Sequence, residues 1–243
     1  MTAVEQVVEL LVRFGFWLVA RSFFRVRVIG SENIPRRGPA LLVANHVTFL
    51  DGFLIGSSVR PIVRFLVWKP YYQLRMIHWA LRLARAIPVG TGPHDSAASV
   101  RGARRQLRRG QVVCIFPEGF ITRTGQMLPF RRGLEKIVQG LDVPVIPIHL
   151  DGLWGSMFSF AGGRAFWKWP RHLRHPAIIS FGPPMPASST THEVEQAVRQ
   201  LGDDAVALRE GRRDTRLAAG DHAVRQTEAV GANREAVAAR DAR

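Results

Sequence analysis

The sequence has 243 residues, of which 47% are hydrophobic and 22% are charged; this balance is typical of a folded globular chain and excludes a disordered or fibrous one. A single cysteine excludes a disulfide framework and a cysteine-based zinc site, and Cys114, within the apolar run 112–116, is expected in the core. The net charge is +15, and because residues 203–243 hold eight arginines against eight acidic residues, the excess lies in residues 1–202. Such a basic surface can bind nucleic acid or an anionic membrane, or it can simply be solvated. The sequence contains no nucleic-acid-binding motif.

The first predicted element is a helix within residues 1–28. Glu9 and Arg13 interrupt its apolar stretch, which therefore falls short of the ~18 residues that a spanning helix needs. A signal peptide is not expected, because Glu5 and Glu9 stand where such a segment is basic. Arginines beside the apolar positions favour a helix lying in the membrane interface, and the other interpretation is a helix packed on its own domain.

Short apolar runs follow, and several are apolar throughout, as in strands covered on both faces. They span residues 26–29, 40–44, 62–67, 87–89, 112–116, 145–150 and 177–181. Helical patterns lie between and after them, most clearly at 96–109, 132–141 and 190–210. The alternation predicts an α/β domain over residues 29–210, with a mixed, mostly parallel central sheet covered by helices.

Two further segments complete this organisation. The helix predicted at 96–109 carries Arg101, Arg104, Arg105 and Arg108 on one face, which is either a solvated face or a contact for anionic headgroups. Residues 211–243 contain almost no large apolar residue, so this polar tail is predicted to be disordered or a frayed helix.

The first motif with chemical content follows the apolar run 40–44. It places Asn45 and His46 at the end of the predicted strand and Asp51 five residues after the histidine. A carboxylate in this position can fix the imidazole tautomer, so that the other ring nitrogen accepts a proton. The spacing alone also fits a structural role, in which Asp51 caps a helix beside a hydrogen-bonded histidine.

The second motif follows the run 112–116 and begins with Pro117, Glu118 and Gly119. Thr122 and Arg123 come next, and Arg131 lies a few residues further on. Backbone donors and guanidinium groups after a strand indicate a phosphate site. The alternative is a Gly/Pro turn with solvated arginines.

Together the two motifs have a familiar order. Residues 38–152 contain Asn45-His46-(x)4-Asp51, followed by Phe116-Pro117-Glu118-Gly119 and then by the strand at 143–148. This order resembles the glycerolipid acyltransferase superfamily, which includes lysophosphatidic acid and glycerol-3-phosphate acyltransferases. The resemblance implies that His46 is the general base and Asp51 its orienting carboxylate. It also implies that Glu118 and Gly119 are part of the acceptor-binding segment. We expect Thr122 and Arg123 to complete the acceptor- and phosphate-binding group, with support from Asn45, Pro117 and Arg131.

The same resemblance implies the reaction and its partners. A fatty acyl group would pass from a thioester, either acyl-CoA or acyl carrier protein, to the hydroxyl of a lysophospholipid or lysophosphatidic acid. No Gly-x-Ser-x-Gly motif is present, so we expect direct attack without an acyl-enzyme, and we expect no metal and no cofactor. The expected location is the cytoplasmic face of the cell membrane, peripheral or monotopic, on an anionic surface and without nucleic acid. The alternative is a non-catalytic lipid-binding protein of the membrane surface.

The acceptor stays open. Residues 116–125, 128–133, 151–156 and 166–170 look like the acyltransferase domain of 2-acylglycerophosphoethanolamine acyltransferases. The branch that forms phosphatidic acid usually has two arginines that this sequence lacks, since it reads Val89-Gly90-Thr91-Gly92 at one place and Ile121 at the other. The sequence therefore predicts a lysophospholipid with a larger headgroup as the acceptor as readily as it predicts lysophosphatidic acid.

Overall fold

The computed structural model describes residues 3–90, 92–166 and 174–211. Contacts group residues 1–202 as one compact unit and residues 203–243 as another. In the second unit residues 203–211 are helical, while the predicted disordered tail lies outside the described residues from 212 onward. Residues 167–170 of the aromatic segment also lie outside them.

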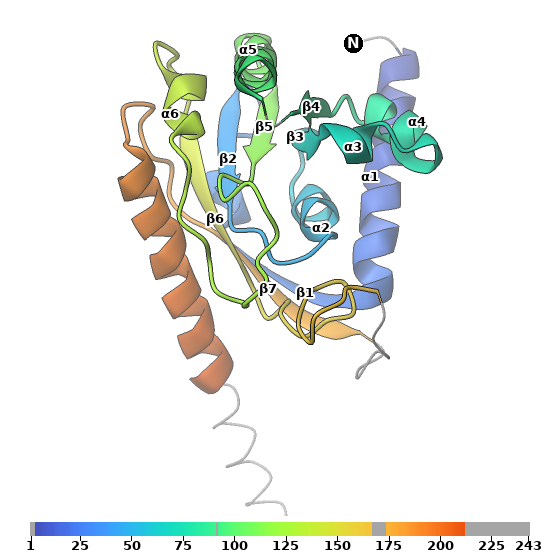
Figure 1. The fold of residues 1–243 in the computed structure, drawn as a ribbon, viewed down its shortest axis with the longest axis vertical. Helices are drawn as coiled ribbons and strands as arrows, with labels where there is room; N and C mark the ends of the chain where they lie inside the picture. Colours follow the sequence, from blue (N-terminus) through green and yellow to red (C-terminus); the bar gives the residue numbers. More distant parts are fainter. Residues whose placement is uncertain (1–2, 91, 167–173, 212–243) are drawn as a thin grey trace, which may run out of the picture. The chain divides into compact units, whose positions relative to one another are not determined.

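All the predicted strands are confirmed, each to within two residues at either end. They are β1 (Phe24–Ile29), β2 (Ala40–Ala44), β3 (Val63–Trp68), β4 (Ile87–Val89), β5 (Val112–Ile115), β6 (Val145–Asp151) and β7 (His175–Phe181). They form one sheet in the order β1-β7-β6-β2-β5-β3-β4 (Figure 1). Only β6 and β7 pair antiparallel among the described strands, so the predicted mixed, mostly parallel sheet is confirmed.

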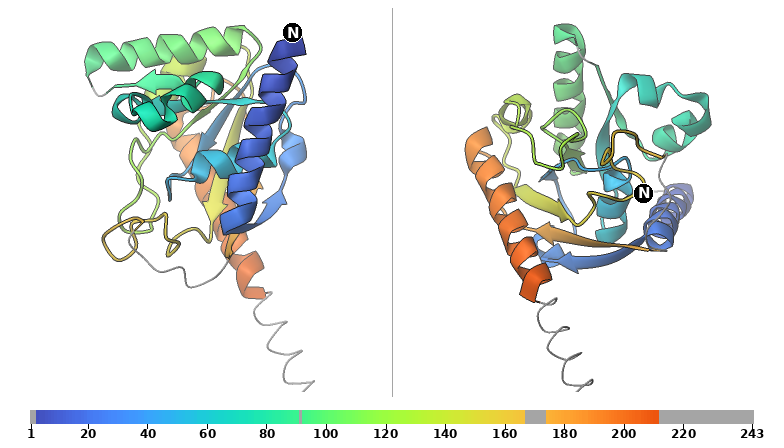
Figure 2. Two further views of the ribbon diagram at one scale, coloured as in Figure 1. Left: turned by 90° about the vertical axis from the view of Figure 1, so that its right-hand side faces the viewer. Right: turned by 60° about the horizontal axis from the view of Figure 1, so that its bottom comes forward.

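Helices cover both faces of the sheet (Figures 1 and 2). They are α1 (Ala3–Phe23), α2 (Asp51–Ser58), α3 (Lys69–Tyr72), α4 (Arg75–Leu83), α5 (Pro93–Arg108) and α6 (Gly133–Val138), with a 3-10 turn η1 (Ser31–Asn33) and a further helix from residue 191. Leu42 and Ala44 of β2 face the core under α1 and α2, while Leu41 and Val43 face the core under α5 and α6. Because successive strand side chains alternate between the faces, covering both faces requires β2 to be apolar throughout.

The predicted N-terminal helix is present as α1, and the residues after Phe23 already belong to β1. One face packs on α2: the ring of Phe16 lies 4.9 Å from that of Phe53, and a Cβ on Gly56 would lie 2.1 Å from the Phe16 ring. The other face leaves Phe14 and Trp17 exposed. Among the described residues, no helix combines the length and apolarity needed to cross a membrane.

Candidate active site

The two sequence motifs meet at one edge of the sheet. His46 follows β2 and Glu118 follows β5, and these strands are parallel neighbours, so their carboxyl ends lie side by side. The backbone N–H of His46 donates to Oε1 of Glu118 at 2.7 Å, and the backbone N–H of Thr122 donates to the carbonyl of His46 at 2.9 Å. The loops therefore form one site in the usual position for α/β sheets.

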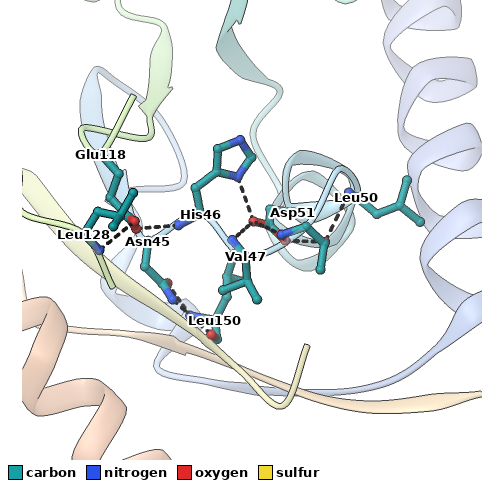
Figure 3. Close-up of polar contacts among 9 residues, drawn as sticks. Asn45, His46, Val47, Leu50, Asp51, Glu118, Leu128 and Leu150 are labelled. Atoms are coloured by element: carbon teal, nitrogen blue, oxygen red, sulfur yellow. Dashed lines mark hydrogen bonds and ion pairs between the residues drawn. The ribbon is translucent and has the colours of Figure 1, made fainter. Parts of the chain in front are cut away.

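His46 and Asp51 form a hydrogen-bonded pair. Nδ1 of His46 lies 2.8 Å from Oδ2 of Asp51. Because a carboxylate can only accept, Nδ1 carries the hydrogen and Nε2 keeps its lone pair. Figure 3 shows the ring edge opposite Nδ1 pointing away from Asp51. The His46 side chain is 21% exposed while Asp51 is buried, so the arrangement presents a proton acceptor to the outside.

Asp51 is held in place by the loop that it follows. It accepts hydrogen bonds from the backbone N–H of Val47 at 2.6 Å and of Thr48 at 3.0 Å, and from the hydroxyl of Thr48 at 2.5 Å (Figure 3). Asp51 is the first residue of α2, but no side chain caps that helix. The helix-capping interpretation of Asp51 is therefore wrong, because its carboxylate turns back onto the histidine loop.

Phe116 contacts the imidazole from the second motif. Its ring lies nearly parallel to the His46 ring, at 17° with 4.2 Å between centroids. Together with the Nδ1 hydrogen bond, this stack limits rotation of the imidazole. Sequence reasoning gave Phe116 no role of its own; the available signal was an aromatic residue at the end of the strand that precedes Pro117.

Glu118 joins the two loops through its carboxylate. It is buried, and its second oxygen accepts the backbone N–H of Leu128 at 2.8 Å while the first accepts that of His46. Burial raises the pKa of Glu118 from 4.5 to about 7, against the opposing effect of these two hydrogen bonds. Both oxygens are thus bonded to backbone, so Glu118 holds the two loops together.

Thr122 and Asn45 also make internal bonds. The buried hydroxyl of Thr122 donates to the carbonyl of Gln126 at 2.6 Å and accepts the N–H of Gly125 at 3.1 Å, which closes the turn. The amide of Asn45 donates to the carbonyl of Leu150 at 3.1 Å and accepts its N–H at 2.7 Å. Asn45 therefore ties the histidine loop to β6.

Arg123 follows Thr122 directly and so lies next to the histidine loop. Its guanidinium is exposed and stands 4.0 Å above the centre of the Phe160 ring. A stacked guanidinium keeps its edge N–H groups available for an anion.

Arg131 lies on the other side of the Pro117–Gly119 turn. Its backbone N–H donates to the carbonyl of Pro117 at 3.0 Å, and its exposed guanidinium stands 5.0 Å from the Phe120 ring centre. Gly119 has φ of +79°, and a Cβ there would lie 3.0 Å from Cζ of Arg131. The glycine therefore permits both the turn and the close approach of the guanidinium.

A pocket opens beside the joined loops. His46, Glu118, Asp151 and Trp154 are among the described residues that line it, and none of those lining residues is an arginine. The titratable side chains on this wall are those of His46, Glu118, His149 and Asp151, and the guanidinium groups of Arg123 and Arg131 do not line it. Within the described ranges, no group of three or more His, Cys, Asp or Glu side chains forms a metal-binding cluster.

Comparison with known proteins adds independent information. The model of the family described as Acyltransferase matches residues 25–151. A 1-acyl-sn-glycerol-3-phosphate acyltransferase of Pseudomonas aeruginosa is 28% identical over 209 residues, which cover 83% of this chain and 74% of that protein. The chloroplastic 1-acyl-sn-glycerol-3-phosphate acyltransferase BAT2 of Brassica napus is 28% identical over 132 residues, covering 54% of this chain and 38% of that protein.

Several of these curated relatives are much longer than the matched part. The chain spans 38%, 37% and 48% of the length of the Brassica napus, Arabidopsis thaliana and Saccharomyces cerevisiae proteins. Among solved structures, the 1-acyl-sn-glycerophosphate acyltransferase PlsC of Thermotoga maritima is similar, with a TM-score of 0.60 and 23% identity, covering 82% of this chain and 79% of that one. At this identity the likeness shows a shared fold.

Proposed function

This chain belongs to the acyltransferase family, and we propose that it moves a fatty acyl group from a thioester donor to the free hydroxyl of a lysophosphatidic acid or another lysophospholipid. The observation that carries the proposal is the hydrogen bond of 2.8 Å between Nδ1 of His46 and Oδ2 of the buried Asp51. The relatives support the acceptor class, since those proteins are 1-acyl-sn-glycerol-3-phosphate acyltransferases.

In the proposed reaction, Nε2 of His46 takes the proton of the acceptor hydroxyl. The hydroxyl oxygen attacks the thioester carbonyl, the new C–O bond forms and the C–S bond breaks. The thiolate leaves and receives the proton from the imidazolium, which restores the base. A positioned general base contributes ~10²–10⁴-fold to such a step. Asp51 stabilises the imidazolium in between, as a buried carboxylate in contact with Nδ1.

The acceptor's phosphate would lie against the exposed arginines. Arg123 is supported because Thr122, the residue before it, bonds to the His46 backbone, and in a glycerolipid the phosphate lies close to the reacting hydroxyl. Arg131 is the second candidate, since its guanidinium lies over Gly119. Charge-assisted bonds from guanidinium to phosphate are strong and directional. The sequence lacks two arginines of the phosphatidic-acid-forming branch, so both acceptor classes belong to the proposal.

We place the reaction at the cytoplasmic face of the membrane, with the protein bound peripherally or monotopically. Its acceptor is a membrane lipid, and its acyl donor is a thioester of coenzyme A or of acyl carrier protein. The basic charge of residues 1–202 and the exposed face of α1 support binding to an anionic surface.

The test is acyl transfer by purified protein offered both donors and a panel of lysophospholipids, with products read by mass spectrometry. His46→Ala should lose transfer by at least 10²-fold while the thermal unfolding transition stays cooperative. His192→Ala is the matched control, because His192 is exposed on the helix from residue 191 and bonds only to Gln196 in the described structure. Near-normal turnover in His46→Ala would refute the base. Lipid binding without any transfer by the wild type would favour a non-catalytic lipid-binding protein.

A further inference from the structure

The segment between β3 and β4 leaves an unusual set of side chains exposed. Trp79 of α4 is 66% exposed, Leu74 just before α4 is 50% exposed, and Leu83 at the end of α4 is also exposed. Trp68 at the end of β3 and Tyr71 of α3 are exposed too. Scattered single apolar residues need no explanation, but a run of large ones on one short segment indicates a binding surface.

Basic residues predominate around these side chains, although Lys69 is paired with Asp95 of α5 at 3.6 Å. Residues 52–94 contain no aspartate or glutamate, and their basic residues are Arg60, Arg64, Lys69, Arg75, Arg82 and Arg85. Arg75 and Arg82 are exposed and lie on the α4 face that carries Trp79, since the spacing is four and three residues. An exposed tryptophan flanked by arginines is the composition of a helix that lies in the headgroup layer of a bilayer.

The exposed face of α1 continues this surface. α4 lies against α1 in the fold (Figure 1), and α1 exposes Leu10, Phe14 and Trp17 on the side turned away from α2. Residues 10–31 contain four arginines and no acidic residue. Two neighbouring helices thus present apolar side chains between basic ones, and the charge selects an anionic bilayer over a neutral protein surface.

A row of aromatic rings joins this surface to the catalytic loop. The Tyr71 ring lies 6.0 Å from the ring of Phe49, which belongs to the loop between His46 and Asp51. Phe49 lies 5.6 Å from Phe160, over which the Arg123 guanidinium stands. The surface is therefore one ring contact away from the loop that carries His46, and Phe49 of that loop contacts the ring over which the Arg123 guanidinium stands.

We propose that the segment from Trp68 to Leu83, centred on α4, together with the outer face of α1, inserts shallowly into an anionic bilayer and so holds His46 at the level of lipid headgroups. Trp79 is the main anchor, and Arg75 and Arg82 bind lipid phosphates. This inference rests on the proposed function for its substrate, because the hydroxyl of a lysophospholipid lies at that level. The catalytic loop then reaches its acceptor without drawing the lipid far out of the membrane.

The test compares variants of the full chain for binding to vesicles of phosphatidylcholine, with and without phosphatidylglycerol, by co-sedimentation. Leu74→Ala/Trp79→Ala/Leu83→Ala should weaken binding about tenfold or more. Arg75→Gln/Arg82→Gln should weaken binding to the anionic vesicles by about fivefold per arginine. Two controls are matched: Arg105→Gln/Arg108→Gln removes the same charge from exposed positions of α5, and Leu208→Ala removes a leucine that is 41% exposed. Both controls should bind as the wild type does.

Acyl transfer separates this inference from the proposed function. The α4 variants should lose transfer to a vesicle-borne acceptor in proportion to binding, yet keep it toward a short-chain acceptor that is dispersed as monomers. If the wild type transfers no acyl group at all but the α4 substitutions still abolish vesicle binding, the membrane-binding surface is supported and the proposed function is refuted. If the α4 variants bind vesicles as well as the wild type does, the proposed membrane-binding surface is refuted. The same holds if these variants have lost self-association instead.

Discussion

Replacing Asp51 by asparagine removes a charge while keeping the shape of the side chain. If the amide oxygen takes the place of Oδ2, it still accepts the hydrogen of His46 Nδ1 and the N–H of Val47. The amide nitrogen then faces the Thr48 hydroxyl, which can rotate to accept. We therefore expect Asp51→Asn to fold, with a loss of about 1–3 kcal/mol from exchanging charge-assisted hydrogen bonds for neutral ones.

The effect on catalysis should be much larger. In the proposed reaction the imidazolium forms in contact with the Asp51 carboxylate, at 2.8 Å between Nδ1 and Oδ2, and the carboxylate is buried. Two opposite charges about 4 Å apart between centres attract by about 4 kcal/mol at an effective dielectric constant of about 20. Since about 1.4 kcal/mol corresponds to tenfold in rate, the turnover number should fall by about 10³-fold.

The assay is the turnover number for acyl transfer at saturating donor and acceptor, measured beside thermal unfolding. Asp142→Asn is the control, because it removes the same charge from an exposed position between α6 and β6. A turnover number within tenfold of wild type in a folded Asp51→Asn protein would refute the reasoning. It would mean that no positive charge develops on His46 in the rate-limiting step.

Other substitutions test the neighbouring contacts. Phe116→Leu removes the ring stacked on His46. Given the energy of an aromatic stack, it should lower the turnover number about 2–10-fold with little change in KM. An unchanged turnover number would exclude a positioning role for Phe116. Burial raises the pKa of Glu118 from 4.5 to about 7, so between these pH values the folded protein holds a proton that the unfolded chain has released. Protonation of Glu118 should therefore stabilise the fold below about pH 4.5, and this stabilisation should be lost as the pH rises to about 7. Glu118→Gln should abolish that part of the pH dependence of the unfolding free energy, and an identical pH profile would contradict the assignment. Gly119→Ala places a Cβ at φ of +79° and close to Arg131, so it should cost about 1–2 kcal/mol of stability in denaturant unfolding. It should also raise the KM for a phosphate-bearing acceptor in kinetic assays. A KM equal to that of the wild type would exclude Arg131 from the phosphate site.

Much of this molecule follows from the sequence alone. The strands were predictable because a strand covered on both faces must be apolar at every position, as β2 and β5 are. The order of the motifs was sufficient to indicate the acyltransferase family and to single out His46 with Asp51. The exposed helices α3 and α4 were not predicted as elements, because each is short and offers too few residues for a long periodic pattern.

Only the tertiary structure decided how the site is assembled. Backbone hydrogen bonds between uniformly apolar strands do not specify partners, so the pairing of β2 with β5, and with it the contact between His46 and Glu118, required the whole sheet. The same holds for Glu118 itself. The family resemblance suggested that it binds the acceptor, but its burial between two backbone N–H groups makes it the link between the loops. The sequence determined which residues were predicted for the site, and the folded chain decided which of them are exposed, as Arg123 is, and which are bonded within the loops, as Glu118 is.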